Sequence, residues 1–195
     1  MIHVIRNIKS NFMKRIKKRQ FDKGSIYGKG TMFDSTSGCQ NGSSISENII
    51  IGSGCMIRGL ICTSGNGKIN IGDHSYIGGA TRIGSVNSIT IGNDVIIAND
   101  THIYDNNNHP VQPQKRMEMT QSGDFFGELW KWEMADNKAI VIEDNVWIGE
   151  RCSILKGVKI GKGAIVGCNS VVTHDVPEYT IVAGNPAKVV KNIPH

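Results

Sequence analysis

The sequence lacks the features of a membrane-spanning or secreted protein. None of the apolar runs among its 195 residues approaches the ~18 residues that a bilayer span needs. The basic N-terminus leads into neither an apolar stretch nor a small-residue cleavage site, so we expect no signal peptide. Its five cysteines show no Cys-x-x-Cys or Cys/His metal spacing, and their number is odd. These absences favour a reduced, cytoplasmic protein with no metal site.

Aromatic residues are scarce, at 6% of the chain, and an excess of basic charge is missing outside one segment. Residues 1–23 contain eight Lys or Arg and one acid, Asp22, so this segment carries +7. Because the whole chain carries +5, the other 172 residues carry −2. The basic character therefore belongs to a short tail, which argues against a body that binds nucleic acid.

The sequence is rich in isoleucine and valine, and many of them recur every six residues. The longest run is Ile142, Ile148, Ile154, Ile160, Val166 and Val172, preceded by Ile45, Ile51, Ile57 and Ile69, by Ile71, Ile77, Ile83 and Ile89, and by Ile91, Ile97 and Ile103. Slips of two residues separate these groups. A period of six fits neither an α-helix nor an exposed strand, and it predicts a solenoid of very short strands.

A second, mostly small residue follows many of the repeat positions by four residues, and we expect both to fill a narrow prism. These residues are Cys55, Ser75, Thr81, Val95, Thr101, Val146, Cys152, Val158, Ala164 and Ser170. Glycine follows the repeat isoleucine at positions 52, 72, 78, 84, 92, 149 and 161, where we expect it to supply the permissive backbone of a turn. Residues 24–48 are predicted to form a first, imperfect coil.

The repeat and two motifs resemble the hexapeptide-repeat acyltransferases. The motifs are Asp-Asn-Val-Trp-Ile-Gly at 144–149 and Ala-Gly-Asn-Pro-Ala-Lys at 183–188, and the resemblance covers roughly residues 45–191. It is greatest to the maltose/galactoside-type and bacterial polysaccharide sugar O-acetyltransferases. It implies an all-β solenoid, a left-handed parallel β-helix, assembled as a homotrimer with active sites between subunits and using acetyl-CoA as co-substrate.

We expect three regions in the chain. Residues 1–23 are predicted to form a basic amphipathic helix and residues 24–176 the β-helix, interrupted by a loop at 104–141, with a C-terminal extension at 177–195. The apolar face of the helix would comprise Ile2, Ile5, Ile8, Phe12 and Ile16. Such a helix could brace its own trimer or lie on an anionic membrane surface at the inner face of the membrane.

The 38-residue interruption between Ile103 and Ile142 is too long for a turn, which favours a functional loop. His109 lies near its start, and an imidazole suits the removal of a proton from an attacking hydroxyl. Pro110 restricts the backbone of His109 to extended conformations. The family's catalytic histidine occupies a matching His-Pro, so the resemblance implies that His109 is the general base.

Other candidate site residues have two interpretations each. Asp105 could orient the imidazole of His109, or it could be an ordinary turn residue. Asn106 and Asn108 could bind acceptor hydroxyls, or they too could belong to the turn. In the family, the tryptophan that matches Trp147 helps shape the acceptor pocket near the histidine, but Trp147 could also pack under the loop.

The resemblance also implies a cofactor-binding set. The matching positions are Ala98, Gly149, Glu150, Gly167, Cys168 and Thr173 for the pantetheine arm, with Lys188 and Lys191 for the nucleotide phosphates. Glu150 and His174 depart from the family, which often has a hydroxyl and a lysine there, and the two lysines could instead form a solvated tail. Nothing in the chain pairs a nucleophile with a base, which favours direct transfer in a ternary complex.

The segment 117–138 concentrates aromatic residues, including Phe125, Trp130 and Trp132. These residues could line a site for an extended glycan acceptor, or they could pack on a neighbouring subunit. The sequence therefore predicts an acetyl-CoA-dependent O-acetyltransferase that acts on a sugar hydroxyl of a bacterial surface polysaccharide or its precursor.

Other functions stay open. One is an antibiotic O-acetyltransferase of the same fold, acting on chloramphenicol or streptogramins. Another is a metalloenzyme resembling the γ-type carbonic anhydrases, although the spacing of His74, His102 and His109 does not match that family. A purely structural solenoid such as an ice-binding prism would need a regular threonine array, which the sequence does not show.

Overall fold

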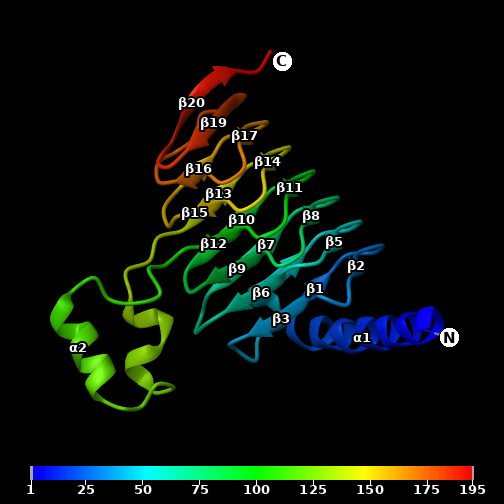
Figure 1. The fold of residues 1–195 in the computed structure, drawn as a ribbon, viewed down its shortest axis with the longest axis horizontal. Helices are drawn as coiled ribbons and strands as arrows, with labels where there is room; N and C mark the ends of the chain where they lie inside the picture. The colour runs from blue at the N-terminus through cyan, green and yellow to red at the C-terminus, as the bar shows by residue number, and fades with distance from the viewer. Residues whose placement is uncertain (1, 195) are drawn as a thin grey trace.

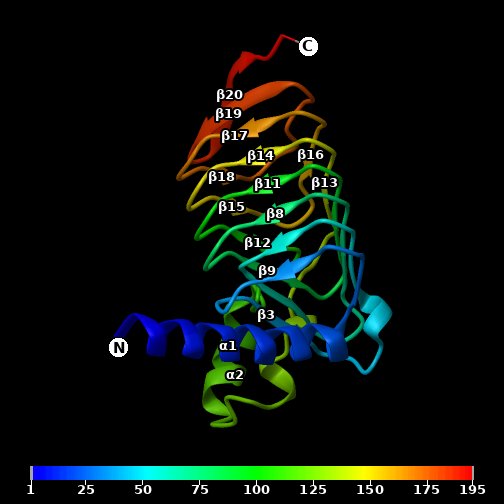
Figure 2. The same cartoon turned by 90° about the vertical axis from the view of Figure 1, so that its right-hand side faces the viewer.

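A computed structural model describes residues 2–194 of the chain, with side chains described for residues 10–194. The chain winds into a triangular prism whose three faces are β-sheets, with one helix across its N-terminal end and one excursion projecting from its side (Figures 1 and 2). This is the left-handed parallel β-helix that the six-residue period predicted. No helix of the described residues is long and apolar enough to cross a membrane.

The three sheets, here called faces A, B and C, receive one strand each from successive coils. Face A consists of β1 (Ile26–Tyr27), β4 (Ile49–Ile51), β7 (Lys68–Ile71), β10 (Ser88–Ile91), β13 (Ile140–Ile142) and β16 (Lys159–Ile160). Face B consists of β2 (Met32–Phe33), β5 (Met56–Ile57), β8 (Tyr76–Ile77), β11 (Ile96–Ile97), β14 (Trp147–Ile148), β17 (Ile165–Val166), β19 (Thr180–Gly184) and β20 (Ala187–Asn192). Face C consists of β3 (Gly38–Asn41), β6 (Leu60–Thr63), β9 (Arg82–Ser85), β12 (His102–Tyr104), β15 (Ser153–Ile154) and β18 (Val171–Val172).

The core is a stack of branched side chains in register. On face B, Ile57, Ile77, Ile97, Ile148 and Val166 lie one above another, and none of the five is exposed. The small residues predicted to point inward, including Cys55 and Cys152, are buried as well. The predicted core is therefore confirmed for almost every repeat position, because parallel strands buried inside a solenoid keep one residue of each repeat facing inward.

Two repeat positions differ from the prediction. Ile45 is 52% exposed, because it precedes the 3₁₀ turn η1 (Ser46–Asn48) and lies outside the strands. Thr63 is buried near the end of β6, but Ile61 occupies the core position in register with Ile83. The first coils are thus less regular than the period alone suggested.

The predicted role of the glycines after the repeat isoleucines needs correction. None of the seven has a positive φ; the left-handed conformation is taken elsewhere, for example by His74 and Asp94 two residues after Gly72 and Gly92. A Cβ at Gly72 would lie 2.6 Å from the backbone of Gly92, and at Gly92 it would lie 2.7 Å from the backbone nitrogen of Asp144. These glycines are required because backbones of successive coils approach closely, not because the turn needs a left-handed residue.

The two-residue slips in the sequence mark longer coils. Ile57, Ile77 and Ile97 are in register at intervals of 20 residues, whereas Ile148 and Val166 are in register 18 residues apart. The additional residues lie at the edge where the chain turns from face C to face A. We call the three edges A–B, B–C and C–A.

Helix α1 (Ile2–Gly24) closes the N-terminal end of the prism (Figure 2). Phe21 in its last turn is fully buried and stacks on Phe33 with 3.9 Å between ring centroids. Lys18 Nζ donates to the hydroxyl of Tyr27 at 2.7 Å. The helix is present as predicted, but the side chains of Ile2, Ile5 and Ile8 lie outside the described residues.

The C-terminal region differs from the expected extension at 177–195. Strand β19 continues face B in parallel with β17, so the chain stays in the solenoid beyond Pro177. Only β20 departs, and it pairs antiparallel with β19. The excursion comprises residues 105–139, slightly shorter than the predicted loop at 104–141, and contains α2 (Pro113–Gln121), η2 (Glu128–Trp130) and η3 (Trp132–Met134).

Candidate functional site

The excursion leaves the prism at the C–A edge through a short paired stem. Asn106 and Asn137 form an antiparallel bridge, the backbone nitrogen of Lys138 donates to the carbonyl of Asp105 at 2.8 Å, and that of Asn107 donates to the carbonyl of Asp136 at 3.1 Å. These bonds hold the two ends of the excursion together. The chain can therefore return to β13 without interrupting the stack of coils.

Asp105 is fully buried at the base of this stem and serves the prism. Its carboxylate accepts hydrogen bonds from Ser85 Oγ at 2.6 Å, from the backbone nitrogens of Val86 and Asn87 at 3.0 and 2.9 Å, and from Asn106 Nδ2 at 3.2 Å. No hydrogen bond joins Asp105 to His109 among the described side chains. Of the two interpretations drawn from the sequence, the geometry supports the turn residue and does not bring this carboxylate to the imidazole.

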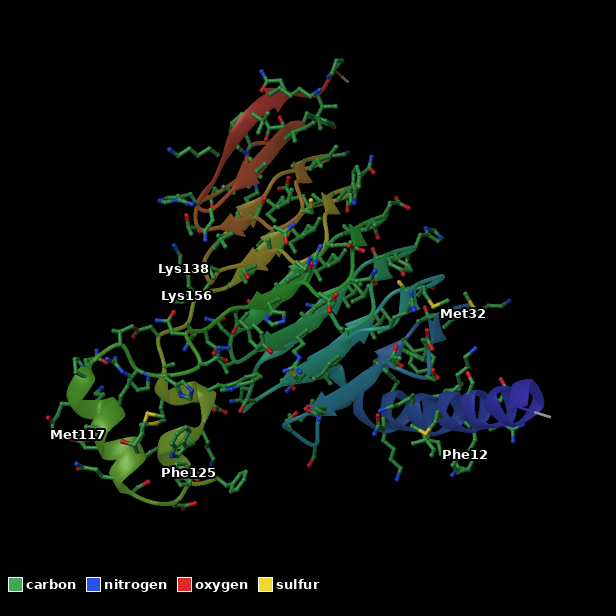
Figure 3. All side chains as sticks on the ribbon, in the orientation of Figure 1. Phe12, Met32, Met117, Phe125, Lys138 and Lys156 are labelled. Carbon is green, nitrogen blue, oxygen red and sulfur yellow. The ribbon has the colours of Figure 1, made fainter. Side chains whose placement is uncertain are left out.

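His109 lies on the exposed side of the excursion, followed by the buried Pro110. Its ring meets the ring of Trp130 edge to face, with 5.5 Å between centroids and an interplanar angle of 84°. Trp130 is itself fixed, because its Nε1 donates to the carbonyl of Met119 at 3.1 Å and its ring lies 5.3 Å from that of Phe125. Phe125 lies on the part of the excursion remote from the prism (Figure 3).

The asparagines before His109 form a tight turn beside a cleft. Asn108 has a φ of +61°, and its backbone nitrogen donates to Asn106 Oδ1 at 2.8 Å. The cleft, which we call the downstream cleft, has a volume of about 310 Å³. It is lined by His102, Tyr104, Asn106, Asn107, Asn108, Ser153, Ile154 and Leu155. Asn106 and Asn108 therefore combine the two expected roles, since they form the turn and line a cleft.

His102 is a candidate that the sequence analysis considered only as a metal ligand. It begins strand β12, is exposed on the outer surface of face C, and lines the downstream cleft. The signal was available, because a residue directly before an inward isoleucine points outward in a strand. Two histidines, one on the prism and one on the excursion, thus lie on or close to this cleft.

A second cleft, which we call the upstream cleft, lies between the excursion and the earlier coils of face C. Its volume is about 260 Å³, and its lining residues are Gln40, Cys62, Thr63, Ser64, Trp130, Lys131 and Trp132. Trp132 meets Tyr104 edge to face at 5.5 Å. Because Tyr104 lines the downstream cleft and Trp132 the upstream one, this aromatic pair stands between the two.

The predicted cofactor residues gather along the B–C edge. The backbone nitrogens of Ala98, Gly149 and Gly167 donate in turn to Ile148, Val166 and Val182, so these three small residues stack in successive coils. Glu150 and Cys168 follow directly in the chain, and Glu150 Oε1 accepts from Asn99 Nδ2 at 2.9 Å. Five of the eight residues thus form one continuous edge.

The other three are more scattered. Lys188 pairs with Ala183, which follows Gly167 in the stack, so it lies at the C-terminal end of the same edge. Lys191 pairs with Ile181 farther along β20. Thr173 follows β18 and lies at the C–A edge, with its hydroxyl 2.8 Å from His174 Nδ1.

Trp147 lies on the outer surface of face B and is 51% exposed. Face B is opposite the C–A edge in the triangular cross-section, so Trp147 and the excursion of the same chain do not meet. The outward residues of face B in register with Trp147 are all apolar or aromatic: Met32, Met56, Tyr76, Ile96, Ile165 and Ile181. Face C instead presents the mixed series Leu60, Arg82, His102, Ser153 and Val171.

The histidines of the metalloenzyme alternative do not converge within one chain. His74 lies at the A–B edge beside Asp94, with 3.6 Å between Nδ1 and Oδ1, whereas His102 lies on face C. Within residues 10–194, no three His, Cys, Asp or Glu side chains are arranged to hold a metal ion.

Comparison with family models matches residues 139–174 to the bacterial transferase hexapeptide family, described as six repeats. This segment is the regular part of the prism that follows the excursion. The comparison confirms the hexapeptide repeat that the six-residue period predicted.

Two curated relatives match parts of the chain. The 2,3,4,5-tetrahydropyridine-2,6-dicarboxylate N-acetyltransferase of Staphylococcus aureus is 58% identical over 52 residues, which are 27% of this chain and 22% of that protein. The provisionally assigned lipopolysaccharide biosynthesis O-acetyl transferase WbbJ of Escherichia coli K12 is 47% identical over 60 residues, 31% of each chain. The chain thus spans between a fifth and a third of the length of these relatives.

A solved structure matches almost the whole chain. It is AntD, an N-acyltransferase from Bacillus cereus in complex with dTDP-4-amino-4,6-dideoxyglucose and coenzyme A. The TM-score is 0.70 at 19% identity, covering 91% of this chain and 89% of that chain. At this identity the likeness establishes the shared fold.

Proposed function

This chain is a hexapeptide-repeat protein, and from that premise we propose that it is an acetyl-CoA-dependent O-acetyltransferase acting on a sugar hydroxyl. The observation that carries the proposal is the excursion, which sets His109 and the asparagine turn beside a cleft on a hexapeptide prism. The name of the WbbJ relative supports an O-acetyl transfer in surface-glycan synthesis.

In the proposed reaction, His109 is the general base. The imidazole takes the proton of the acceptor hydroxyl while its oxygen attacks the thioester carbonyl of acetyl-CoA. Collapse of the tetrahedral intermediate breaks the carbon–sulfur bond, and the thiolate of CoA leaves and takes up a proton. The product is an acetyl ester and free CoA, with no covalent acyl-enzyme. The contact with Trp130 favours a fixed ring plane for the base, which reduces the cost of reaching the reactive geometry.

The B–C edge is the proposed binding surface of acetyl-CoA. Its stacked small residues leave room for the pantetheine arm to lie against the backbone, and Lys188 at the end of the edge suits the negative charge of the nucleotide phosphates. The carboxylate of Glu150 lies on the same edge, and its bond with Asn99 turns it toward the previous coil.

We propose that the active site is completed in a homotrimer. Trp147 and His109 lie on opposite sides of one prism, so they can share a site only if a second copy brings them together. The apolar column on face B supports such an assembly, because seven outward apolar or aromatic residues in a row form a surface that water solvates poorly.

We also propose that α1 docks on an anionic membrane surface at the cytoplasmic face. Phe12 is 62% exposed and points away from the prism (Figure 3), whereas Lys14, Arg15 and Lys18 line a cleft on the prism side together with Met32. An amphipathic helix with a charge of +7 in residues 1–23 suits an anionic lipid surface.

Vesicle sedimentation tests this docking. The protein should sediment with phosphatidylglycerol vesicles and not with phosphatidylcholine vesicles, and Phe12→Ser should weaken sedimentation. Phe126→Ser is the matched control, because Phe126 is an exposed aromatic outside α1. Equal sedimentation with both lipids, or none with either, would contradict the docking.

Transfer assays test the activity. Purified protein and acetyl-CoA are offered surface glycans, chloramphenicol, streptogramins and small amines, and release of CoA is measured. We expect release with glycans, and His109→Ala should reduce it by about 10²–10⁴-fold while acetyl-CoA binding is retained.

His102→Ala is the matched histidine variant in the same assay. Loss of transfer in His102→Ala with full activity in His109→Ala would assign the base to His102 instead. Release of CoA only with an antibiotic or an amine would overturn the proposed acceptor.

A further inference from the structure

We propose that the upstream cleft is a carbohydrate subsite that binds a second, uncharged sugar of an oligosaccharide acceptor. The protein would then act on a glycan chain in preference to a monosaccharide. This inference rests on the proposed function, because it identifies the acceptor of the same site more closely.

The upstream cleft is continuous with the proposed base. Trp130 lines this cleft and also contacts the ring of His109. An acceptor whose hydroxyl reaches His109 therefore has the indole of Trp130 beside it, and the next sugar of the chain lies in the direction of Lys131 and Trp132. One side chain thus connects the reacting position with the cleft.

The two tryptophans of the cleft are held in place before any ligand binds. Trp130 is anchored through Nε1 to Met119, and Trp132 lies against Tyr104. Gly84 makes room for the second pair, because a Cβ there would lie 2.4 Å from the ring of Tyr104 and 3.1 Å from that of Trp132. Fixed indole rings suit the apolar C–H faces of a sugar, since little side-chain entropy is lost on binding.

The far wall of the cleft offers polar groups from the prism. Gln40 is exposed, and its side-chain amide makes no hydrogen bond to another described residue, so it is free to bind sugar hydroxyls. Ser64 Oγ donates to the carboxylate of Glu133 at 2.9 Å, and this bond holds η3 against the coil. The excursion and the prism therefore form the cleft together.

The charges around the cleft favour an uncharged sugar over an anionic group. Lys131 Nζ, the one cation among the lining residues, forms an ion pair with Glu128, and the carboxylate of Glu133 lies at the border. Burial raises the pKa of the Cys62 thiol to about 11, so this residue is not a nucleophile at neutral pH. Aromatic faces and a free amide thus remain as the recognition groups.

Steady-state kinetics with two forms of one acceptor test the subsite. The glycan identified in the transfer assay is supplied as an oligosaccharide and as its monosaccharide unit. We expect the wild type to have a higher kcat/KM for the oligosaccharide. Trp132→Ala should lower that value by about three- to tenfold, mainly through KM, and leave the monosaccharide value unchanged. Trp132→Phe should restore most of the loss.

Two further variants keep the result interpretable. Gln40→Ala removes an exposed side chain that supports no packing, so it should reduce oligosaccharide use even if Trp132→Ala does not fold. Phe126→Ala is the matched control, because this aromatic residue is 98% exposed on the same excursion, and it should change neither value. Equal use of both acceptors by the wild type, or equal losses for both in the Gln40 and Trp132 variants, would overturn the subsite.

A binding measurement separates this inference from the proposed function. The oligosaccharide is titrated into His109→Ala protein, with and without Gln40→Ala. Binding that Gln40→Ala weakens supports the subsite even if His109 proves not to be the base. Absence of binding, together with transfer to the monosaccharide, would overturn the subsite and leave the proposed activity standing.

Discussion

The prism and the excursion are stabilised in different ways. The prism buries columns of isoleucine and valine such as Ile97 and Ile148, each in contact with the coils above and below. The excursion buries few apolar side chains, among them Met119 and Ala135, and it is attached by individual polar bonds such as Ser64–Glu133. The comparison teaches that the site is assembled from a stable scaffold and a separately anchored segment, so the segment can change without loss of the fold.

The largest effect should follow from a cavity in the prism. Ile148→Ala removes a fully buried side chain from the middle of the face B column and should lower the free energy of unfolding by about 2–5 kcal/mol. Ile45→Ala is the control, because Ile45 is 52% exposed, and it should change stability by less than about 0.5 kcal/mol. Urea denaturation followed by circular dichroism measures both. Similar losses in the two variants would contradict the assignment of the core.

A smaller and local effect should follow at the junction of the two regions. Asp105→Ala leaves the hydroxyl of Ser85 and the backbone nitrogens of Val86 and Asn87 without their acceptor, at a cost of about 1–3 kcal/mol. Hydrogen exchange at Val86 and Asn87 should accelerate, and residues 113–134 should become more sensitive to protease. If Asp105 acted mainly on His109, the pH profile of transfer would change and the exchange rates would not.

The smallest effect concerns a thiol at the boundary. Cys62 lies on β6 beneath the excursion, and because burial raises its pKa to about 11, about one thiol in a thousand is ionised at pH 8. Iodoacetamide should therefore modify the exposed Cys168 first. The thiolate fraction of Cys62 rises about tenfold per pH unit below its pKa, so its labelling should accelerate as pH rises toward 11. Mass spectrometry of tryptic peptides measures both sites, and equal rates at pH 8 would contradict the burial of Cys62.

The six-residue period predicted the prism because each repeat places the same kind of residue at the same point of the cross-section. Ile77, Ile97 and Ile148 could therefore be assigned to the core before any coordinates. The neighbours of a residue in the next coil depend instead on the lengths of the edges. That is why the close approach of Gly72 to Gly92, and the continuation of face B through β19, did not follow from the period.

The candidate site was predictable only in part for the same reason. His109 is marked by its own sequence context, and the excursion by the break in the repeat. The partners of Asp105 lie in the previous coil, and Ser64 lies 69 residues before Glu133, so no local pattern indicated these contacts. The outward position of His102 was implied by the strand pattern, although a strand of this kind does not show which outward residues face a cleft.

The antiparallel strand β20 has a consequence for how the molecule behaves in solution. A stack of parallel strands presents unpaired backbone groups at its last rung, and such a rung is a template on which another molecule can continue the sheet. Strand β20 covers the last parallel strand of face B with a reversed strand that carries Lys188 and Lys191, while α1 covers the first coil at the other end. The two ends therefore limit growth into fibres, as lysine-bearing edge strands do in other sheet proteins.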